Sequence, residues 1–175
     1  MIRHLVAAIG LSAVAATAVP SAQAAGDPLL APPGTCAGQA TPAAPKAVQE
    51  TAMRCLINYA RARKGMAALR PHAWLTRKAH TKVQRVEACQ EFSHTPCGVP
   101  NTLSGSRLVR FGEVIYASPT ASRGTARAAM AGWLSSPPHR RALLTPSYRW
   151  VGVGVSKAAT LNGRRTWIWA ATLGV

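Results

Sequence analysis

Apolar residues recur at helical spacing near the start of the chain. They stand three or four positions apart across 46–64, which predicts an amphipathic helix with these residues on its buried face. Gly65 follows and is a typical helix stop. The apolar positions of this helix are Val48, Ala52, Leu56 and Tyr59.

A second helix is predicted over 73–91 by the same spacing. Its expected buried stripe consists of Leu75, Ala79, Val83 and Val86. The basic residues expected to face solvent are Arg77, Lys78, Lys82 and Arg85. We interpret this basic run as a solvated helix face, because no aromatic residues alternate with it as they do in nucleic-acid stacking platforms.

The remaining pattern combines strands with short helices. Residues 110–117 form an apolar run around one acid, Glu113, and predict a buried strand. Valine and glycine alternate over 150–155, and the apolar segment 166–172 follows the turn pair Asn162-Gly163, which predicts a β-hairpin.

Two short helices lie between the predicted strand and the hairpin. The first begins at Ser122 or Thr125 and ends near Ser136, where two prolines follow. The second spans 139–144, with Pro138 in its first turn. Helices, a strand, more helix and a hairpin together predict an α+β layered domain.

The N-terminus is typical of an exported protein. Residues 1–24 have a basic start, an alanine-rich apolar run and a small-residue cleavage site, which predicts a signal peptide. The apolar run is short for a membrane span, so we expect no transmembrane segment in the mature protein. Residues 25–45 are interpreted as a flexible Pro/Ala/Gly-rich arm, and 46–175 as the folded domain.

The chain has a large positive net charge. Lys and Arg number 21 and Asp and Glu only 5, for a net charge of +16; losing Arg3 with the signal leaves +15. Such a protein is attracted to anionic polymers, so a basic adhesin for wall polymers is one hypothesis. The alternative is a solubilising charge that reflects amino-acid usage alone, and we expect no specific nucleic-acid partner.

The four cysteines indicate two disulfides, because an exported chain folds in an oxidising compartment. Sequence alone allows three pairings. We favour Cys89–Cys97, a short clip across the segment that contains His94, together with Cys36–Cys55, which ties the N-terminal arm to the first helix. A thiolate metal site is less favoured, because no CxxC pair is present.

Three residues far apart in sequence, His94, Glu113 and His139, could meet in one cleft lined also by Ser93 and Ser136. Two imidazoles and a carboxylate suit zinc, or they form an acid–base or anion-recognition pair. In the structural alternative, Glu113 is a buried acid paired with His139 or an arginine. Ser93 is not expected to act as a nucleophile, because the glycines of a nucleophile elbow are absent.

An ordered set of motifs resembles the CAP superfamily, which comprises the cysteine-rich secretory, antigen 5 and pathogenesis-related 1 proteins. The chain is most similar to its bacterial SCP-like branch, over 47–175. The motifs are Phe92-Ser93-His94, Gly112-Glu113-Val114-Ile115, Trp133, Ser136-Pro137-Pro138-His139-Arg140 and Val151-Gly152-Val153-Gly154-Val155.

The resemblance implies a three-layer α-β-α sandwich in which His94, Glu113 and His139 line a central cleft. This chain departs from the family pattern in two places. The segment 134–136 contains no second acid, and Val114 replaces the asparagine that follows the family's Gly-Glu.

Two functions of different classes follow. The first is a secreted, non-enzymatic binding module that recognises a lipid, glycan or cell-envelope ligand through the His/Glu cleft. The second is a zinc-assisted hydrolase of peptide or envelope polymers, with His94, Glu113 and His139 as metal ligands or catalytic groups. The missing second acid disfavours the hydrolase, because no obvious general base remains once Glu113 binds the metal.

Overall fold

The computed structural model describes residues 27–102 and 107–175. The expected signal peptide lies outside these residues. The elements, in chain order, are α1 (Lys46–Ala62), β1 (Arg70–Pro71), α2 (Ala73–Ala88), the 3-10 turn η1 (Pro96–Gly98), β2 (Phe111–Ser118), α3 (Ala126–Ser135), α4 (Pro137–Leu143), β3 (Trp150–Leu161) and β4 (Arg164–Gly174).

One four-stranded sheet has the order β1-β3-β4-β2. The β3–β4 hairpin is confirmed, and its turn residues Asn162 and Gly163 both have positive φ angles, as a tight hairpin turn requires. β2 pairs antiparallel with β4, and the short β1 lies parallel to β3. The hairpin is therefore the centre of the sheet, and β2 is an edge strand.

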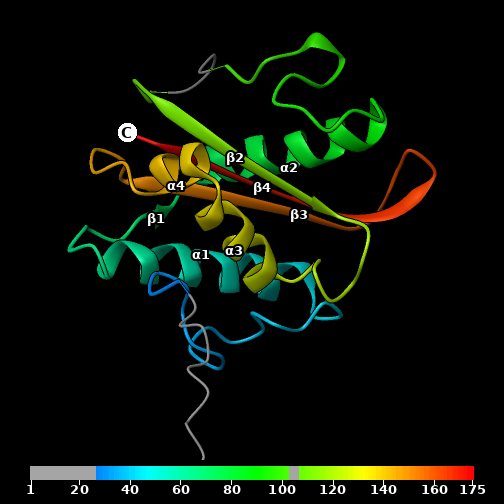
Figure 1. Ribbon diagram of the computed structural model, residues 1–175. Coiled ribbons are helices and arrows are strands. Elements are labelled where there is room, and N and C mark those ends of the chain that lie inside the picture. Colours follow the sequence, from blue (N-terminus) through cyan, green and yellow to red (C-terminus); the bar gives the residue numbers. More distant parts are fainter. Residues whose placement is uncertain (1–26, 103–106) are drawn as a thin grey trace, which may run out of the picture.

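Helices cover both faces of the sheet (Figure 1). α1 and α3 lie on one face, where Leu56, Trp133 and Trp169 belong to the main hydrophobic core. α2 lies on the other face, over a smaller core that includes Val83 and Ile168. The predicted α+β class is confirmed.

α2 lies directly on β3, without a layer of side chains between the two backbones. A Cβ atom placed on Gly152 would be 2.0 Å from the carbonyl carbon of Leu75, and one on Gly154 would be 2.7 Å from that of Ala79. The alternating glycines of this strand therefore permit close helix–strand packing, which fixes the position of α2.

The buried face of α1 includes Ala52 and Leu56, as predicted, but differs in the first turn. Val48 is 40% exposed, whereas Gln49 and Met53 are buried. The side-chain amide of Gln49 donates to the backbone carbonyls of Pro42 and Ala44, so the preceding segment determines which residues of the first turn are covered. The helix is thus rotated relative to the simplest apolar pattern.

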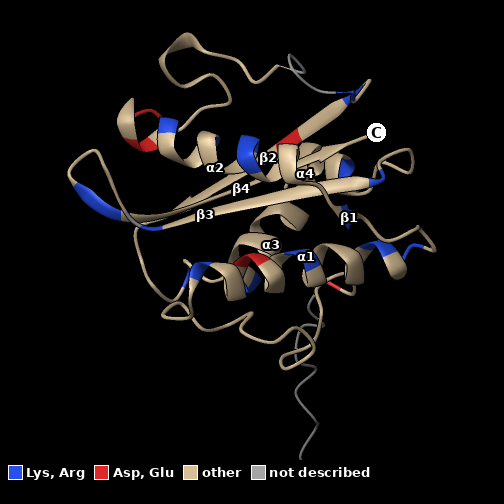
Figure 2. Ribbon diagram, turned by 180° about the vertical axis from the view of Figure 1, so that it is seen from behind, with Lys and Arg blue, Asp and Glu red and all other residues tan. Residues whose placement is uncertain are grey.

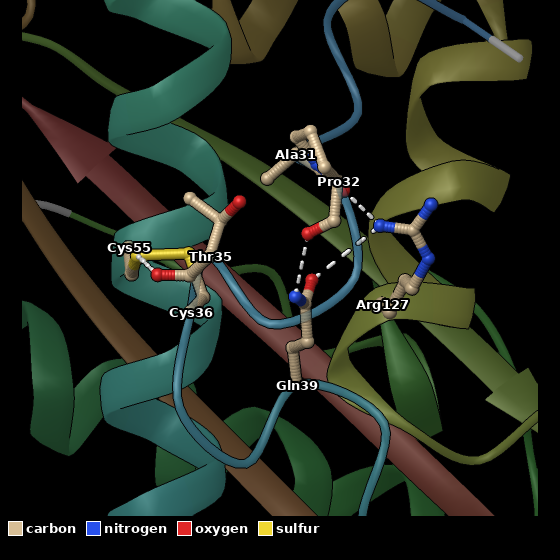
Figure 3. Close-up of a disulfide and its surroundings, with 7 residues drawn as sticks. All are labelled: Ala31, Pro32, Thr35, Cys36, Gln39, Cys55 and Arg127. Atoms are coloured by element: carbon tan, nitrogen blue, oxygen red, sulfur yellow. Dashed lines mark hydrogen bonds between the residues drawn. A yellow bond between two sulfur atoms is a disulfide. The ribbon is translucent and has the colours of Figure 1, made fainter.

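The segment 27–45 packs against the domain, although little in it was expected to do so. Leu29, Ala31 and Cys36 are buried in the main core. Figure 3 shows Cys36 joined to Cys55 of α1, while Arg127 of α3 donates to the backbone carbonyl of Ala31. The predicted Cys36–Cys55 disulfide is confirmed, and it anchors this segment to α1.

No helix within 27–102 or 107–175 combines the length and the apolar character needed to cross a membrane.

Candidate functional site

The loop after α2 positions His94. α2 ends at Ala88, and the predicted disulfide Cys89–Cys97 is confirmed, closing the loop at its base. The carboxylate of Glu91 accepts hydrogen bonds from the Ser93 hydroxyl at 2.7 Å and from the Cys97 amide at 2.9 Å. These two donors lower the pKa of the exposed Glu91 carboxyl. The loop therefore has a defined shape around His94.

Glu113 lies in β2, opposite Thr172 of β4, and its side chain is only 7% exposed. One carboxylate oxygen, Oε1, lies 2.9 Å from Nδ1 of His94 and 3.2 Å from Nζ of Lys82. The other, Oε2, accepts a hydrogen bond from the side-chain amide of Asn101. Both oxygens of this buried acid are therefore engaged by protein donors.

Lys82 is a correction to the sequence analysis, which placed it on the solvent face of α2. Its side chain is 1% exposed, and its ammonium group also donates to the backbone carbonyl of His94. Position 82 is three residues after Ala79 and four before Val86, both buried, so it belongs to the inward face of the helix. A buried lysine is stable here because Glu113 neutralises its charge.

His139 approaches the same place from α4. Its ring centroid lies 6.2 Å from that of His94, with the ring planes inclined at 50°. Burial, and then the neighbouring His94, lower the pKa of His139 below its ordinary value of 6.5, so this imidazole is neutral at pH 7. The structure thus brings together His94, Glu113 and His139 from three separate segments of the chain.

The two predicted serines contribute less directly. The hydroxyl of Ser93 is bonded within its own loop, to Glu91 and the Thr95 amide. Ser136 precedes α4, where its backbone carbonyl accepts from the Arg140 amide. Within the described part of the chain, its side chain makes no hydrogen bond to either imidazole or to the carboxylate.

Sequence reasoning missed Lys82 and Asn101 as partners of Glu113. The spacing of Lys82 from Ala79 and Val86 was a usable signal, but Asn101 lies in an irregular loop whose path no pattern predicts. Val114, at the position of the family's asparagine, is fully buried in the main core on the other face of the sheet. Asn101 supplies Glu113 with a side-chain amide partner from a different element.

The residues do not fit a three-ligand zinc centre. Within 27–102 and 107–175, no three His, Cys, Asp or Glu side chains are grouped so that they could hold a metal ion. The ammonium group of Lys82 beside Glu113 Oε1 opposes a cation there. Zinc held by His94, His139 and Glu113 therefore stays a prediction that this arrangement does not favour.

The arrangement gives each group a distinct role. The carboxylate of Glu113 accepts from Nδ1 of His94, which fixes the ring and leaves Nε2 free to face a ligand. His94 is 54% exposed, so this nitrogen is accessible. Glu113, already paired with Lys82, is an orienting group for His94 and is poorly placed to remove a proton from water.

A cavity also lies away from the imidazole pair. It has a volume of about 520 Å³ and lies between α1 and α2, beside Glu50 and His80. There, Oε1 of Glu50 and Nε2 of His80 are 2.9 Å apart. The imidazole pair of His94 and His139 does not line this cavity, so the candidate site is a surface feature rather than the mouth of that cavity.

Three bacterial structures share this fold. The chain is similar to an extracellular protein of Bacillus anthracis with an SCP domain, at a TM-score of 0.60 and 21% identity, over 74% of this chain and 41% of that one. An outer surface protein of Borrelia burgdorferi has a TM-score of 0.56 and 16% identity, over 70% and 88% of the two chains. A cysteine-rich secretory protein of Staphylococcus aureus has a TM-score of 0.57 and 15% identity, over 75% of this chain and 40% of that one.

These similarities establish the fold: the chain has the α+β fold that these three bacterial proteins share. The family model for the cysteine-rich secretory protein family, CAP, matches residues 55–171. The chain therefore belongs to the CAP family, as its motifs predicted. It spans 41% of the Bacillus protein's length, and no curated protein sequence matches it.

Proposed function

We propose that this protein is an exported, non-enzymatic binding module that recognises a lipid, glycan or cell-envelope ligand through His94 and His139. The observation that supports this function is the fully engaged Glu113 carboxylate behind an exposed imidazole. Such a network orients a hydrogen-bonding group for recognition. The extracellular or outer-surface character of the similar bacterial proteins supports export.

The same network disfavours the hydrolase. A metal-assisted hydrolase needs a metal-bound water and a free base beside it. Lys82, His94 and Asn101 all contact Glu113, which is the acid such a mechanism would require. The helix that precedes His139 offers no second acid, since positions 134–136 are Leu, Ser and Ser.

The imidazole pair suits a neutral or weakly polar group of a ligand. His139 is neutral at pH 7 because its pKa is lowered. His94 presents Nε2 as a hydrogen-bond acceptor when its Nδ1 proton points to Glu113. A ligand hydroxyl, as in a glycan or a lipid headgroup, can donate to such a nitrogen.

The decisive experiment combines binding with zinc titration on the mature, oxidised protein. Glycan and lipid arrays should reveal a saturable ligand, and both His94→Ala and His139→Ala should weaken its binding at least about tenfold. His80→Ala, a histidine outside the site, is the matched control and should bind normally. Equal binding by all four proteins would refute the assignment of the site.

Zinc titration separates the two functions. The binding module should hold its ligand after chelator treatment and show no turnover of peptide or envelope polymers. Stoichiometric zinc binding that is lost in the His94→Ala/His139→Ala variant, together with chelator-sensitive turnover, would instead establish the hydrolase.

A further inference from the structure

A basic pocket lies on the flank of α2, next to the candidate site. It has a volume of about 320 Å³. Its lining residues are Trp74, Arg77, Lys78, Thr81, Arg85 and Asn101. Five of these occupy one side of the helix, at the three- and four-residue spacing that places side chains above one another. Asn101 closes the pocket from the loop and also donates to Glu113.

This pocket changes the interpretation of the basic run, which the sequence suggested was a plain solvated face. Trp74 provides an aromatic wall, and the ammonium of Lys78 lies over its ring, 4.9 Å from the centroid. A cation–π contact of this kind holds the lysine side chain in place. The charge of Lys78 is therefore positioned at the pocket rather than dispersed in solvent.

The two arginines of the pocket have no anionic partner. Among residues 27–102 and 107–175, the guanidinium groups of Arg77 and Arg85 take part in no side-chain hydrogen bond or ion pair. Each arginine carries a planar fork of donors that matches the oxygens of phosphate and similar anions.

None of the five acidic side chains of the chain neutralises them. All five of its acidic side chains lie in the described segments, and each is engaged elsewhere. Asp27 pairs with Arg140, Glu50 with His80, Glu87 with the Thr160 amide, Glu91 with its own loop, and Glu113 with Lys82. Neutralisation of this pocket must therefore come from an external anion.

We propose that the α2 pocket binds a linear polymer of tetrahedral oxyanions, with phosphate or sulfate esters repeated along its length. Arg77 and Arg85 are eight residues apart, which on an α-helix is a rise of about 12 Å. Successive anions of one chain can therefore meet the two guanidinium groups, while a single ion reaches only one. Lys78 contributes a third positive charge between them.

This site goes beyond the proposed function, since it uses neither imidazole. Lys and Arg also occur on α1 and on the β3–β4 hairpin (Figure 2), but this pocket brings three of them together around one aromatic side chain. Because Asn101 lines the pocket and contacts Glu113, a polymer bound along α2 would lie next to His94. Envelope attachment and ligand recognition would then occur side by side on one surface.

The test is isothermal titration calorimetry in 0.15 M salt, where long-range surface attraction is largely screened. One arm uses a glycerol phosphate oligomer and the other a heparin-derived oligosaccharide, which distinguishes a phosphate source from a sulfate source. The pocket variant is Arg77→Gln/Arg85→Gln. The control is Arg63→Gln/Arg123→Gln, which removes the same charge from two exposed arginines that line none of the described cavities.

The pocket variant should bind at least about tenfold more weakly than the unmodified protein, given the strength of charge-assisted hydrogen bonds. The control should change less than about twofold. The His94→Ala/His139→Ala variant should bind the polymer normally, which separates this site from the proposed ligand site. Equal weakening in pocket variant and control, or no binding of either polymer, would overturn the proposal.

Discussion

Replacing Lys82 by methionine tests the charge network at its most buried member. Methionine is also long and unbranched, so it fills a similar space but lacks the ammonium group. Lys82 is 1% exposed and contacts both Glu113 Oε1 and the His94 carbonyl. The substitution leaves a carboxylate that is 7% exposed without its cation.

The expected loss of unfolding free energy is about 3 kcal/mol. Breaking a buried ion pair from one side costs about 3–5 kcal/mol. The lower end applies here, because His94 and Asn101 still donate to Glu113 in the variant. Urea denaturation of the disulfide-intact protein, followed by tryptophan fluorescence, measures this difference.

Two further proteins make the result specific. Lys64→Met, at an exposed position just after α1, should change the unfolding free energy by less than about 0.5 kcal/mol. Lys82→Met/Glu113→Gln removes both charges and retains an amide that can bond with His94 and Asn101. It should recover most of the loss, since replacing a whole buried pair is often nearly neutral. If Lys82→Met costs less than about 1 kcal/mol, or the double variant is no more stable, the reasoning is wrong.

Three other substitutions test other parts of the structure. Gly152→Ala should cost more than about 3 kcal/mol of unfolding free energy, because its Cβ would meet the α2 backbone at 2.0 Å. The control Gly163→Ala, whose Cβ has no atom within 4 Å, should cost only ~1 kcal/mol through its positive φ. Equal costs for the two variants would contradict the close packing. Cys89→Ser/Cys97→Ser should lower the unfolding free energy by about 2–3 kcal/mol, since the disulfide closes a loop with a sequence separation of 8. An unchanged urea midpoint would contradict this. The lowered pKa of His139 means that the unfolded chain takes up its proton first, so the wild type should lose stability as the pH falls below 6.5. When urea midpoints are measured at a series of pH values, His139→Gln should lose less stability at low pH than the wild type. Parallel curves for the two proteins would show that His139 does not cause the loss.

Local patterns predicted the elements well, because each depends on nearby residues. The hairpin followed from Asn162-Gly163 between two apolar segments. The four cysteines and the export signal indicated two disulfides, and the favoured one of three possible pairings is the one observed. The hydroxyl of Thr125, one of the two candidate N-cap residues, accepts a hydrogen bond from the Ala128 amide at the start of α3. The meeting of His94 and His139 followed from the family resemblance rather than from any local pattern.

The remaining features depend on tertiary contacts. Lys82 was predicted to be exposed because a lysine is usually solvated, although its spacing placed it on the inward face. The acid that balances its charge, Glu113, lies 31 positions away on a different element. Asn101 was missed because its position depends on the path of a loop without a regular pattern. α1 turned Gln49 inward because Pro42 and Ala44 accept its amide hydrogen bonds. In each case a polar side chain found a partner that sequence spacing does not encode.

The contact between α2 and β3 also determines how far the site can adapt to a ligand. At Gly152 and Gly154 the first half of α2 packs backbone on backbone against β3, with no side chains in between. Lys82 and most of the basic pocket therefore lie on a helix that is held firmly against the sheet. On the opposite side, the His94 loop is itself closed by the Cys89–Cys97 disulfide, so both sides of the site keep a defined shape. Ligands should therefore be selected by how well they fit a preformed surface, with little rearrangement of the protein on binding.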